Sequence, residues 1–331
     1  MPPGENKSVP DDGDDYYLLD ETSAKDLSFV PLPRPKGPIS KYFRTQLVWY
    51  NIIGIGTLHL ISLYAIIVSP SARLGTWLMY MWMYMMTGLG VTAGSHRMWT
   101  HKSYKAHWSY RLVLTILNTA AFQNHVIEWS RDHRTHHKFS ETDADPHNAH
   151  RGFFFAHCGW LMCRKHPEVI RKGRMIDISD LEADPFLAFQ RKYYPILVLL
   201  LAFIAPTILN SWITGDTYLN SFLIPGVLRY VSTLHITWSV NSAAHLWGAH
   251  PYDDTIHPAE NLIVSMGAIG EGFHNYHHCF PWDYSTSEYG PLFNGTTCFI
   301  DIAAALGLVW DRKKASPAVI KARRSRTGDK S

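Results

Sequence analysis

Cysteine and net charge are both scarce in this chain of 331 residues. Its four cysteines contain no CxxC pair, so no disulfide framework is indicated, and this usage fits a reducing, cytosol-facing catalytic portion. The net charge of +3 is too small to imply a general affinity for nucleic acid. The sequence also lacks a GxSxG elbow, a P-loop and an HExxH motif, so none of these catalytic devices explains its function.

Long apolar segments come in two pairs, and they predict four membrane-spanning helices. Residues 47–68 and 77–95 form the first pair, and residues 196–213 and 221–244 form the second. Each is close to the roughly 20 residues that cross a bilayer, and the short links within each pair predict helical hairpins. Tryptophan and tyrosine gather near the segment ends, which favours membrane spans over four buried helices of a soluble protein. Residues 1–20 lack a signal-peptide pattern, so we expect the first span to be its own signal and anchor.

Basic residues set the expected orientation. They precede the first span, fill the region between the hairpins and end the chain, whereas the two hairpin loops contain only Arg73. By the positive-inside rule, both termini and the central region should be cytosolic. The sequon at Asn294 should then stay unglycosylated. The expected organisation is a polar tail at 1–45, a membrane domain at 46–312 and a basic tail at 313–331.

Histidine is the residue in excess, because the chain has 19 and they cluster. Residues 133–137 and 274–278 both read HxxHH. Positions i, i+3 and i+4 of an α-helix share one face, so each box is expected to present three imidazoles to one point. Two such boxes beside predicted spans, both on the side expected to be cytosolic, are not a chance occurrence. They predict a metal site at the cytosolic end of the membrane domain.

Two further pairs extend this pattern. Asn241 and His245 are four residues apart and share a helix face by the same rule. His96 and His101 are five apart and do not, so the helix is expected to end or bend within residues 94–100, at the membrane surface. Imidazole binds iron, copper, zinc and nickel alike, so the residue type does not choose the metal.

Ten other histidines are interpreted as packing or surface residues. For His147, in the string DADPHN at 143–148, a supporting role behind a metal ligand stays open. The ten are His59, His107, His125, His147, His150, His157, His166, His235, His250 and His257.

At these clusters the sequence resembles the membrane acyl-CoA desaturases of the stearoyl-CoA Δ9 type. The similarity extends from about Val48 to Asp329, which is nearly everything beyond the N-terminal tail. The matching strings are EWSRDHRTHH at 128–137, DADPHN at 143–148, RGFFF at 151–155, RKHP at 164–167, NSAAH at 241–245 and GEGFHNYHH at 270–278.

The resemblance implies an all-α integral membrane protein of the endoplasmic reticulum, with four spans in two hairpins and a helical cytosolic cap that holds a di-iron centre. It implies that O₂ is used to insert a cis double bond, at Δ9, into a saturated fatty acyl-CoA. Electrons would come from NADH through cytochrome b5 reductase and cytochrome b5, a separate partner because this chain has no His-Pro-Gly-Gly haem motif. The implied ligands of the two iron ions are His96, His101, His133, His136, His137, His245, His274, His277, His278 and, through a water, Asn241.

The resemblance also carries over substrate contacts. The chain departs from the family pattern at Tyr50, where an arginine is usual, and at His125, where an aspartate is common. Cationic contacts suit the phosphates of CoA. The implied CoA contacts are Asn51, Asn124, Arg131, Asp132, Arg164 and Lys165. The implied walls of a kinked acyl tunnel are Gln123, Trp129, Thr237 and Trp238.

Tyr80 and Tyr84 predict a limit on acyl length. The second span leads directly into His96, so its side chains should line the far end of the tunnel, and residues four apart share a helix face. By register from His96, Tyr84 stands where the resembling enzymes often have a small residue. A phenol there would shorten the tunnel and favour chains of about 14 to 16 carbons. The alternative is that Tyr84 faces lipid or a neighbouring helix.

Two other function classes stay open from the residues alone. A membrane di-iron hydroxylase would use the same histidines and release a hydroxy-acyl product. A non-catalytic metal-binding membrane protein or transporter would place its polar ligands near the middle of the bilayer. The position of the histidines at the cytosolic side of the spans favours the enzyme.

Overall fold

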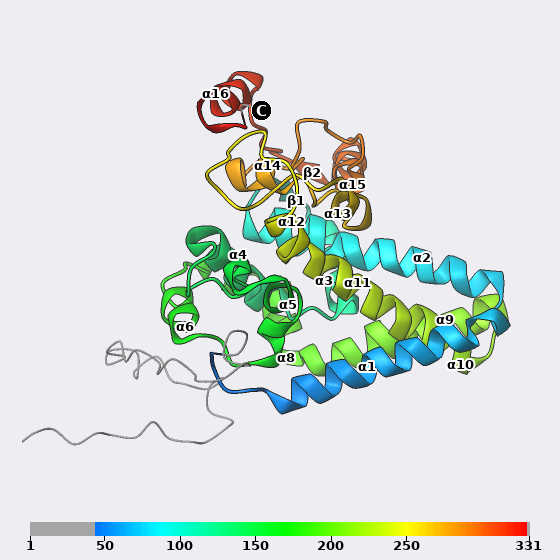
Figure 1. Ribbon diagram of the computed structural model, residues 1–331. Coiled ribbons are helices and arrows are strands. Elements are labelled where there is room, and N and C mark those ends of the chain that lie inside the picture. Colours follow the sequence, from blue (N-terminus) through cyan, green and yellow to red (C-terminus); the bar gives the residue numbers. More distant parts are fainter. Residues whose placement is uncertain (1–43, 330–331) are drawn as a thin grey trace, which may run out of the picture.

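The computed structural model describes residues 44–329, and nearly all of the regular secondary structure in this part of the chain is helical. Four long helices run side by side as one body, and shorter helices gather at one end of that body as a cap (Figure 1). The expected all-α fold is therefore confirmed. Residues 1–43 of the predicted polar tail lie outside the described residues.

Four long helices overlap the four predicted spans, although the third begins at Pro185, well before the predicted start at residue 196. Three of them contain π-helical stretches, in which the backbone bonds reach one residue further than in an α-helix. The helices are α1 (Trp49–Val68); α2 (Leu74–Leu89) with π-helical Gly90–Thr100; α8 (Pro185–Val198), π-helical Leu199–Ile204 and α9 (Ala205–Thr214); and α10 (Tyr218–Ser221), π-helical Phe222–Leu228 and α11 (Arg229–Asn241).

Two of the four helices are long and apolar enough to cross a membrane. They are Trp49–Ser71 and Pro185–Thr214, with mean hydropathies of 2.0 and 2.2. The other two are interrupted by Gly, Ser and Thr, and α11 also carries Arg229. Arg229 is fully buried and donates to three backbone carbonyls at 3.1–3.2 Å, so its charge lies inside the helix body. The length of these two remaining helices is typical of a membrane span, but their composition is less so.

The cap consists of short elements from the middle and the end of the chain. Its two strands pair antiparallel, with Lys105 opposite Trp310. The cap helices are α3 (Trp108–Ala121), α4 (Val126–Phe139), α5 (Phe153–His157), α6 (Pro167–Gly173), α7 (Ser179–Glu182), α12 (Ala243–Leu246), α13 (Leu262–Gly267), α14 (His274–Cys279), α15 (Gly295–Ala305) and α16 (Pro317–Thr327), and the strands are β1 (Lys105–Ala106) and β2 (Val309–Trp310). Single 3-10 turns lie at Ser69–Ser71, Ala149–Arg151 and Gly159–Met162.

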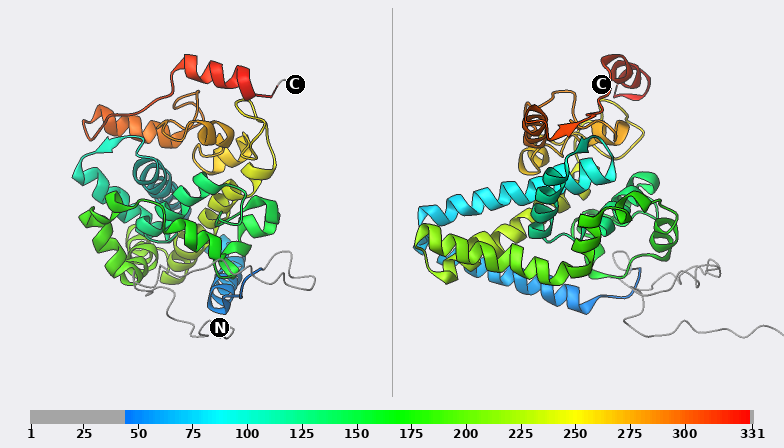
Figure 2. Two further views of the ribbon diagram at one scale, coloured as in Figure 1. Left: turned by 90° about the vertical axis from the view of Figure 1, so that its left-hand side faces the viewer. Right: turned by 180° about the vertical axis from the view of Figure 1, so that it is seen from behind.

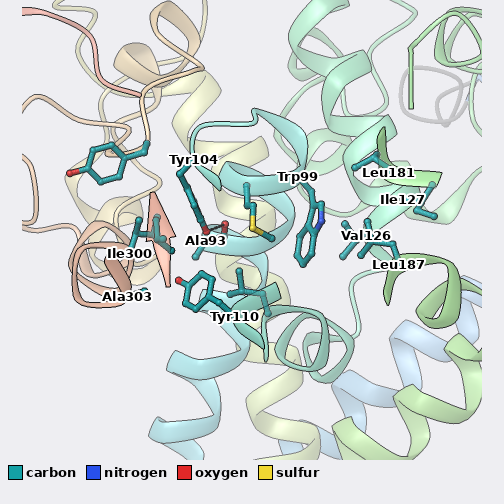
Figure 3. Packing of buried hydrophobic residues seen from close by; sticks show 14 residues of the cluster. Ala93, Trp99, Tyr104, Tyr110, Val126, Ile127, Leu181, Leu187, Ile300 and Ala303 are labelled. Carbon is teal, nitrogen blue, oxygen red and sulfur yellow. Dashed lines mark hydrogen bonds between the residues drawn. The ribbon is translucent and has the colours of Figure 1, made fainter. Parts of the chain in front are cut away.

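A hydrophobic core fixes the end of the second long helix against the cap (Figure 3). Trp99, on the π-helical stretch, is 6% exposed, and its indole nitrogen lies 3.3 Å from the Asp184 carboxylate at the start of α8. Burying one large apolar side chain stabilises a fold by roughly 1.5–3 kcal/mol. Most residues of this core come from six helices, namely Ala93, Trp99, Tyr110, Val126, Ile127, Leu181, Leu187, Ile300 and Ala303, and others come from loops and β2.

The C-terminal segment, expected to be a basic tail, folds as α16 at the outer edge of the cap (Figure 2). Ala315 and Ile320 are buried with Tyr276 of α14 in one apolar cluster. Arg323 and Arg324 bind the carboxylates of Asp253 and Glu288. Two of the four basic residues of α16, Arg323 and Arg324, thus have acidic partners within the fold, which the charge pattern along the sequence did not reveal.

The closed ends of the two hairpins lie at the end of the helix body away from the cap (Figure 1). A buried polar cluster joins them there. Asp216, 7% exposed, accepts hydrogen bonds from the Arg73 amide at 2.9 Å and the Thr76 hydroxyl at 2.6 Å, both in the first hairpin. Asn220 donates to it from the second hairpin at 2.9 Å. Burial disfavours the charge, but these donors outweigh it and lower the pKa of Asp216 to about 2. This carboxylate therefore holds the closed ends of the two hairpins together.

Replacing Asp216 should loosen the helix body. We expect Asp216→Ala to lower the free energy of unfolding by about 1.5–3 kcal/mol, because donors on both hairpins lose a charged acceptor. Thermal unfolding of the detergent-solubilised protein measures this loss. Asp216→Asn keeps an acceptor oxygen and should lose clearly less stability. Equal midpoints for Asp216→Ala and the wild type would contradict the assigned role.

Candidate metal centre

Nine histidines meet in two adjacent groups between the helix body and the cap. Ligand atoms within each group lie within 4.8 Å of one another, and each group could hold a metal ion. The rings of His137 and His278, which belong to different groups, stack at 4.2 Å. The first group is His96, His101, His133, His137 and His277, and the second is His136, His245, His274 and His278. These are the nine histidines that the sequence predicts as ligands.

Each HxxHH box divides its imidazoles between the two groups, so the expectation that a box serves one point is wrong. In α4, His133 and His137 join the first group and His136 joins the second. In α14, the box 274–278 does the reverse, with its first and last histidines in the second group. Successive helix residues are rotated by about 100°, so i and i+4 nearly align while neighbouring residues diverge. One box therefore bridges two sites.

The backbone before His101 is π-helical, and this brings an otherwise mismatched pair together. The amide of His101 donates to the carbonyl of His96 at 3.2 Å, a bond between residues five apart. A π-turn contains more residues than an α-turn, so this spacing falls on one face. The two ring centroids are 4.9 Å apart. The helix ends at Thr100, inside the range expected for its end, but it widens into a π-helix before it does so.

The ring nitrogens face one another at the spacing of metal ligands. Nε2 of His277 lies 3.0 Å from Nε2 of His96 and 2.9 Å from Nε2 of His137. In the second group, Nε2 of His274 and Nε2 of His245 are 2.9 Å apart. Two ligands at right angles on one ion, with bonds of about 2.1 Å, are separated by about 3 Å. Buried Nε2 atoms that lack a hydrogen-bond partner belong to His101, His136 and His278. The residues fit two metal ions.

Burial keeps most of these imidazoles in the form that binds a metal. Removal from water lowers their pKa well below the usual value, and the neighbouring imidazoles lower it further. At neutral pH they are uncharged, so each offers a lone pair, and metal binding should weaken only in acid. The histidines shifted in this way are His101, His133, His137, His274, His277 and His278.

Two carboxylates orient the ligands of the second group. Nδ1 of His136 donates to Asp145 at 2.9 Å, and Nδ1 of His245 donates to Glu141 at 2.7 Å. With Nδ1 protonated, each ring points the lone pair of Nε2 toward the centre. Burial opposes the charge of Asp145, but His136 outweighs it and holds the pKa of this carboxyl far below its usual value. Neither carboxylate was among the residues predicted from the sequence.

A third carboxylate orients the first group and is held by a buried arginine. Glu271 lies 2.9 Å from Nδ1 of His96. Arg97, 0% exposed, donates to Glu271 from Nε at 3.0 Å and to three further acceptors on segment 284–297. Burial raises the pKa of Glu271, but Arg97 outweighs this and lowers it overall. One of the arginine's acceptors is Asn294, which is 1% exposed and therefore poorly accessible to glycosylation.

His147 lies directly behind the second group. Its ring centroid is 4.4 Å from that of His136, and its Nδ1 is 3.5 Å from Asp145. Burial, followed by repulsion from His136, lowers the pKa of His147 to about 3, so the ring is neutral. The position matches the supporting role that the sequence left open. Other predicted surface histidines serve as helix N-caps, namely His107, His125 and His166.

The predicted tunnel residues lie around the first group and α11. Gln123 donates to the Thr237 hydroxyl at 3.0 Å, which joins the loop before α4 to α11. The Trp129 ring lies 4.8 Å from that of His133, and Trp238 is 3% exposed. Asn241 ends α11, and the helix is interrupted at Ser242 before α12 begins. Its contact with a metal through water stays a prediction.

The predicted CoA contacts fall into two sets. Lys165 binds Asp132 at 2.6 Å and Glu128 at 3.3 Å, and Arg131 lies 3.7 Å from Asp132. These charges are therefore paired on the surface of α4. The other set lies where the start of α1 meets segment 161–165, through bonds from Asn51 to the Leu161 carbonyl and from the Arg164 amide to Gln46. Asn124 precedes α4 in a left-handed conformation, with φ of 70°.

Tyr80 and Tyr84 both point between α2 and its neighbours. The Tyr80 hydroxyl donates to Ser232 of α11 at 2.9 Å, and the Tyr84 hydroxyl donates to the Gly267 carbonyl of α13 at 2.8 Å. Their rings stack with centroids 6.4 Å apart. Tyr84 thus contacts a neighbouring helix, and its role at the end of a tunnel stays a prediction.

Removing the charge of Asp145 should weaken the second group selectively. Loss of such a supporting carboxylate typically costs 10- to 100-fold in metal affinity. We expect Asp145→Asn, dialysed against a chelator series, to lose about one of two metal ions per chain at chelator strengths that the wild type withstands. The exposed Asp311→Asn is the matched control. Equal retention by both variants would show that Asp145 does not support a ligand.

Comparison with known proteins finds desaturases that match this chain over most of its length. A model of the fatty acid desaturase family matches residues 71–294. Stearoyl-CoA desaturase of Capra hircus is 55% identical over 299 residues, which cover 90% of this chain and 81% of that protein. The human stearoyl-CoA desaturase is 54% identical (95% and 87% covered), and an acyl-CoA Delta-9 desaturase of Acheta domesticus is 51% identical (91% and 84% covered). Identity at this level, far beyond the histidine boxes, shows that the chain belongs to the fatty acid desaturase family.

Proposed function

We propose that this chain is an acyl-CoA desaturase that inserts a cis double bond, at Δ9, into a saturated fatty acyl-CoA. The single observation that carries the proposal is the pair of adjacent histidine groups, whose inward nitrogens lie about one ligand spacing apart. The names and high identity of the relatives support the reaction and the acyl-CoA substrate. A hydroxylase would use a similar centre, and the product distinguishes the two.

The metal ions are proposed to be two irons, one in each histidine group. An unactivated methylene C–H bond does not yield to acid–base chemistry, and a redox metal with O₂ supplies the required oxidant. The protein's own contribution is to position the ligands. Asp145, Glu141 and Glu271 fix three of the rings, and burial of the groups keeps water away from the reacting carbon.

The membrane arrangement is proposed to be two hairpins in the endoplasmic reticulum membrane, with both termini in the cytosol. Basic residues gather on the cap side, and the opposite tips carry Arg73 and Asp216, which neighbour one another through a hydrogen bond. Two of the four helices have the composition of a span, and the other two pack against them along their length. Electrons would arrive at the cap from cytochrome b5, reduced by NADH through cytochrome b5 reductase.

The CoA portion of the substrate is proposed to bind beside α4 and the start of α1. Arg131, Lys165 and Arg164 would contact its phosphates, with Asn51, Asn124 and Asp132 around them. The acyl chain would then pass Gln123 and Thr237 toward the first histidine group, beside Trp129. Trp238 would form a further part of the wall.

Expression in a desaturase-deficient yeast tests the proposed reaction. We expect the wild type to restore growth, and mapping of the double bonds in the lipids should locate them at Δ9. The purified protein should contain about two irons per chain, one for each histidine group. His136→Ala should abolish product without unfolding the helix body, whereas His107→Asn, which preserves a helix cap, should stay active. A hydroxy-acyl product, or full activity with about one iron, would overturn the proposal.

Acyl-chain length is proposed to be limited by Tyr84, in favour of about 14 to 16 carbons over 18. Two lost methylenes at ~0.8 kcal/mol each correspond to a preference of roughly tenfold. Tyr84→Ala should therefore raise the ratio of stearoyl-CoA to palmitoyl-CoA use by up to about tenfold in direct competition. Tyr84→Phe removes only the hydroxyl bonded to Gly267 and should leave the ratio near that of the wild type. A wild-type preference for stearoyl-CoA would refute the idea.

A further inference from the structure

Two exposed histidines of the cap face each other from separate loops. His150 belongs to the segment between α4 and α5, and His257 belongs to the segment between α12 and α13. Their Nε2 atoms lie 2.9 Å apart, although 107 residues separate them along the chain. The ring planes are nearly perpendicular, at 88°, with centroids 4.5 Å apart. The sequence alone assigned both rings to packing or the surface, and neither belongs to the two histidine groups.

Backbone carbonyls hold this pair in place. Nδ1 of His150 lies 3.1 Å from the Glu141 carbonyl, which can only accept, so this nitrogen carries the proton and Nε2 of the neutral ring presents a lone pair. A bond from Nδ1 to a backbone carbonyl is how many metal-binding histidines are oriented. On the other loop, Nε2 of His250 donates to the His257 carbonyl at 3.1 Å, which closes the loop 250–257.

His257 has two ways to meet the lone pair of His150. With its proton on Nε2, it donates an ordinary hydrogen bond. With its proton on Nδ1, where water accepts it because the side chain is exposed, both Nε2 atoms direct lone pairs at one point. The second arrangement is repulsive unless a cation lies between the rings, and a metal ion selects it because its ligands must be deprotonated.

The spacing of the two nitrogens suits an ion whose ligands stand at right angles. Bonds of about 2.1 Å place such nitrogens about 3 Å apart, whereas a tetrahedral pair is about 3.4 Å apart. The observed 2.9 Å therefore favours an octahedral or square-planar ion over tetrahedral zinc. Water can complete the coordination, because both side chains are exposed.

We propose that His150 and His257 bind a third metal ion, a divalent ion of the first transition row such as ferrous iron, outside the two histidine groups. The ion joins the segment after α4 to the loop 250–257. The site itself does not depend on the proposed reaction.

Glu141 connects this site to the second histidine group. Its carbonyl accepts from His150, and its carboxylate accepts from Nδ1 of His245 at 2.7 Å. Its φ of 57° is left-handed, which is unfavourable for a residue with a side chain, so its conformation depends on the contacts on its two sides. An ion bound to His150 therefore steadies Glu141 and, through it, the ring of His245.

A capped copper complex tests the site directly. Copper(II) iminodiacetate has two open positions at right angles, which suit two exposed imidazoles at this spacing. With zinc-loaded protein in lipid nanodiscs, we expect an electron paramagnetic resonance spectrum with two coordinated imidazole nitrogens. His150→Asn and His257→Asn should each weaken binding by about 100-fold, because loss of a supporting partner alone costs roughly 10- to 100-fold.

The matched control is His59→Asn, which removes one ring of another facing pair. Nε2 of His59 lies 3.0 Å from Nε2 of His235, but this pair belongs to α1 and α11 of the helix body. The control should bind the complex as the wild type does. A wild type that binds no complex, or that shows a single imidazole nitrogen, would overturn the site. Binding by His150→Asn that equals that of the wild type would do the same.

Hydrogen exchange tests the link to Glu141. Ferrous ion added without oxygen to metal-loaded protein should slow amide exchange in residues 140–150 and raise the midpoint of thermal unfolding, because a ligand that binds the folded state stabilises it. Neither change should occur in His257→Asn. Exchange that ferrous ion leaves unaltered in the wild type would overturn the link. A site that binds these probes in a protein without desaturase activity would stand, and only the proposed reaction would be contradicted.

Discussion

Nine imidazoles can pack into one buried space only if they stay uncharged. Their inward nitrogen atoms must also bind a partner, such as a metal ion, because their lone pairs would otherwise face one another. Much of the surrounding structure serves this condition. Burial suppresses protonation of most of the rings, and three carboxylates accept the outward Nδ1 protons, so the inner lone pairs converge. The carboxylate of Glu271 is in turn kept ionised by Arg97, itself fully buried. The charged groups nearest to the two histidine groups are therefore the carboxylates on the outer side of the rings, and not the rings themselves.

The histidine clusters and the family resemblance named the nine histidines that converge, but not how these divide into two groups. The nine histidines could be named because HxxHH and the paired histidines are local patterns, and the structure brings all nine together. Their division between two groups depends on how far each residue is rotated around the axis of α4 or α14. Assigning positions i, i+3 and i+4 to one helix face ignores this rotation. The pair His96 and His101 required a π-helix, and a five-residue spacing alone does not distinguish a π-turn from a helix end.

Partners far apart along the chain were beyond sequence reasoning. Glu141 is 104 residues from His245, and Glu271 is 174 residues from Arg97. Both carboxylates lie within four residues of a predicted ligand, Glu141 after His137 and Glu271 before His274, which is the only local signal they carry. The four long helices were located approximately because runs of apolar residues are a local property, and two of the four are apolar enough to cross a membrane. The basic C-terminal segment folds as α16, and Arg323 and Arg324 pair with Asp253 and Glu288, which lie 70 and 36 residues earlier and therefore leave no local signal.

The position of α16 gives the second box a support that lies far from it in the sequence. Ile320 of α16 shares a buried cluster with Tyr276, which stands between the histidines of α14. A substitution that detaches α16 would therefore loosen α14 and the three histidines that it carries, although no residue of α16 belongs to either histidine group.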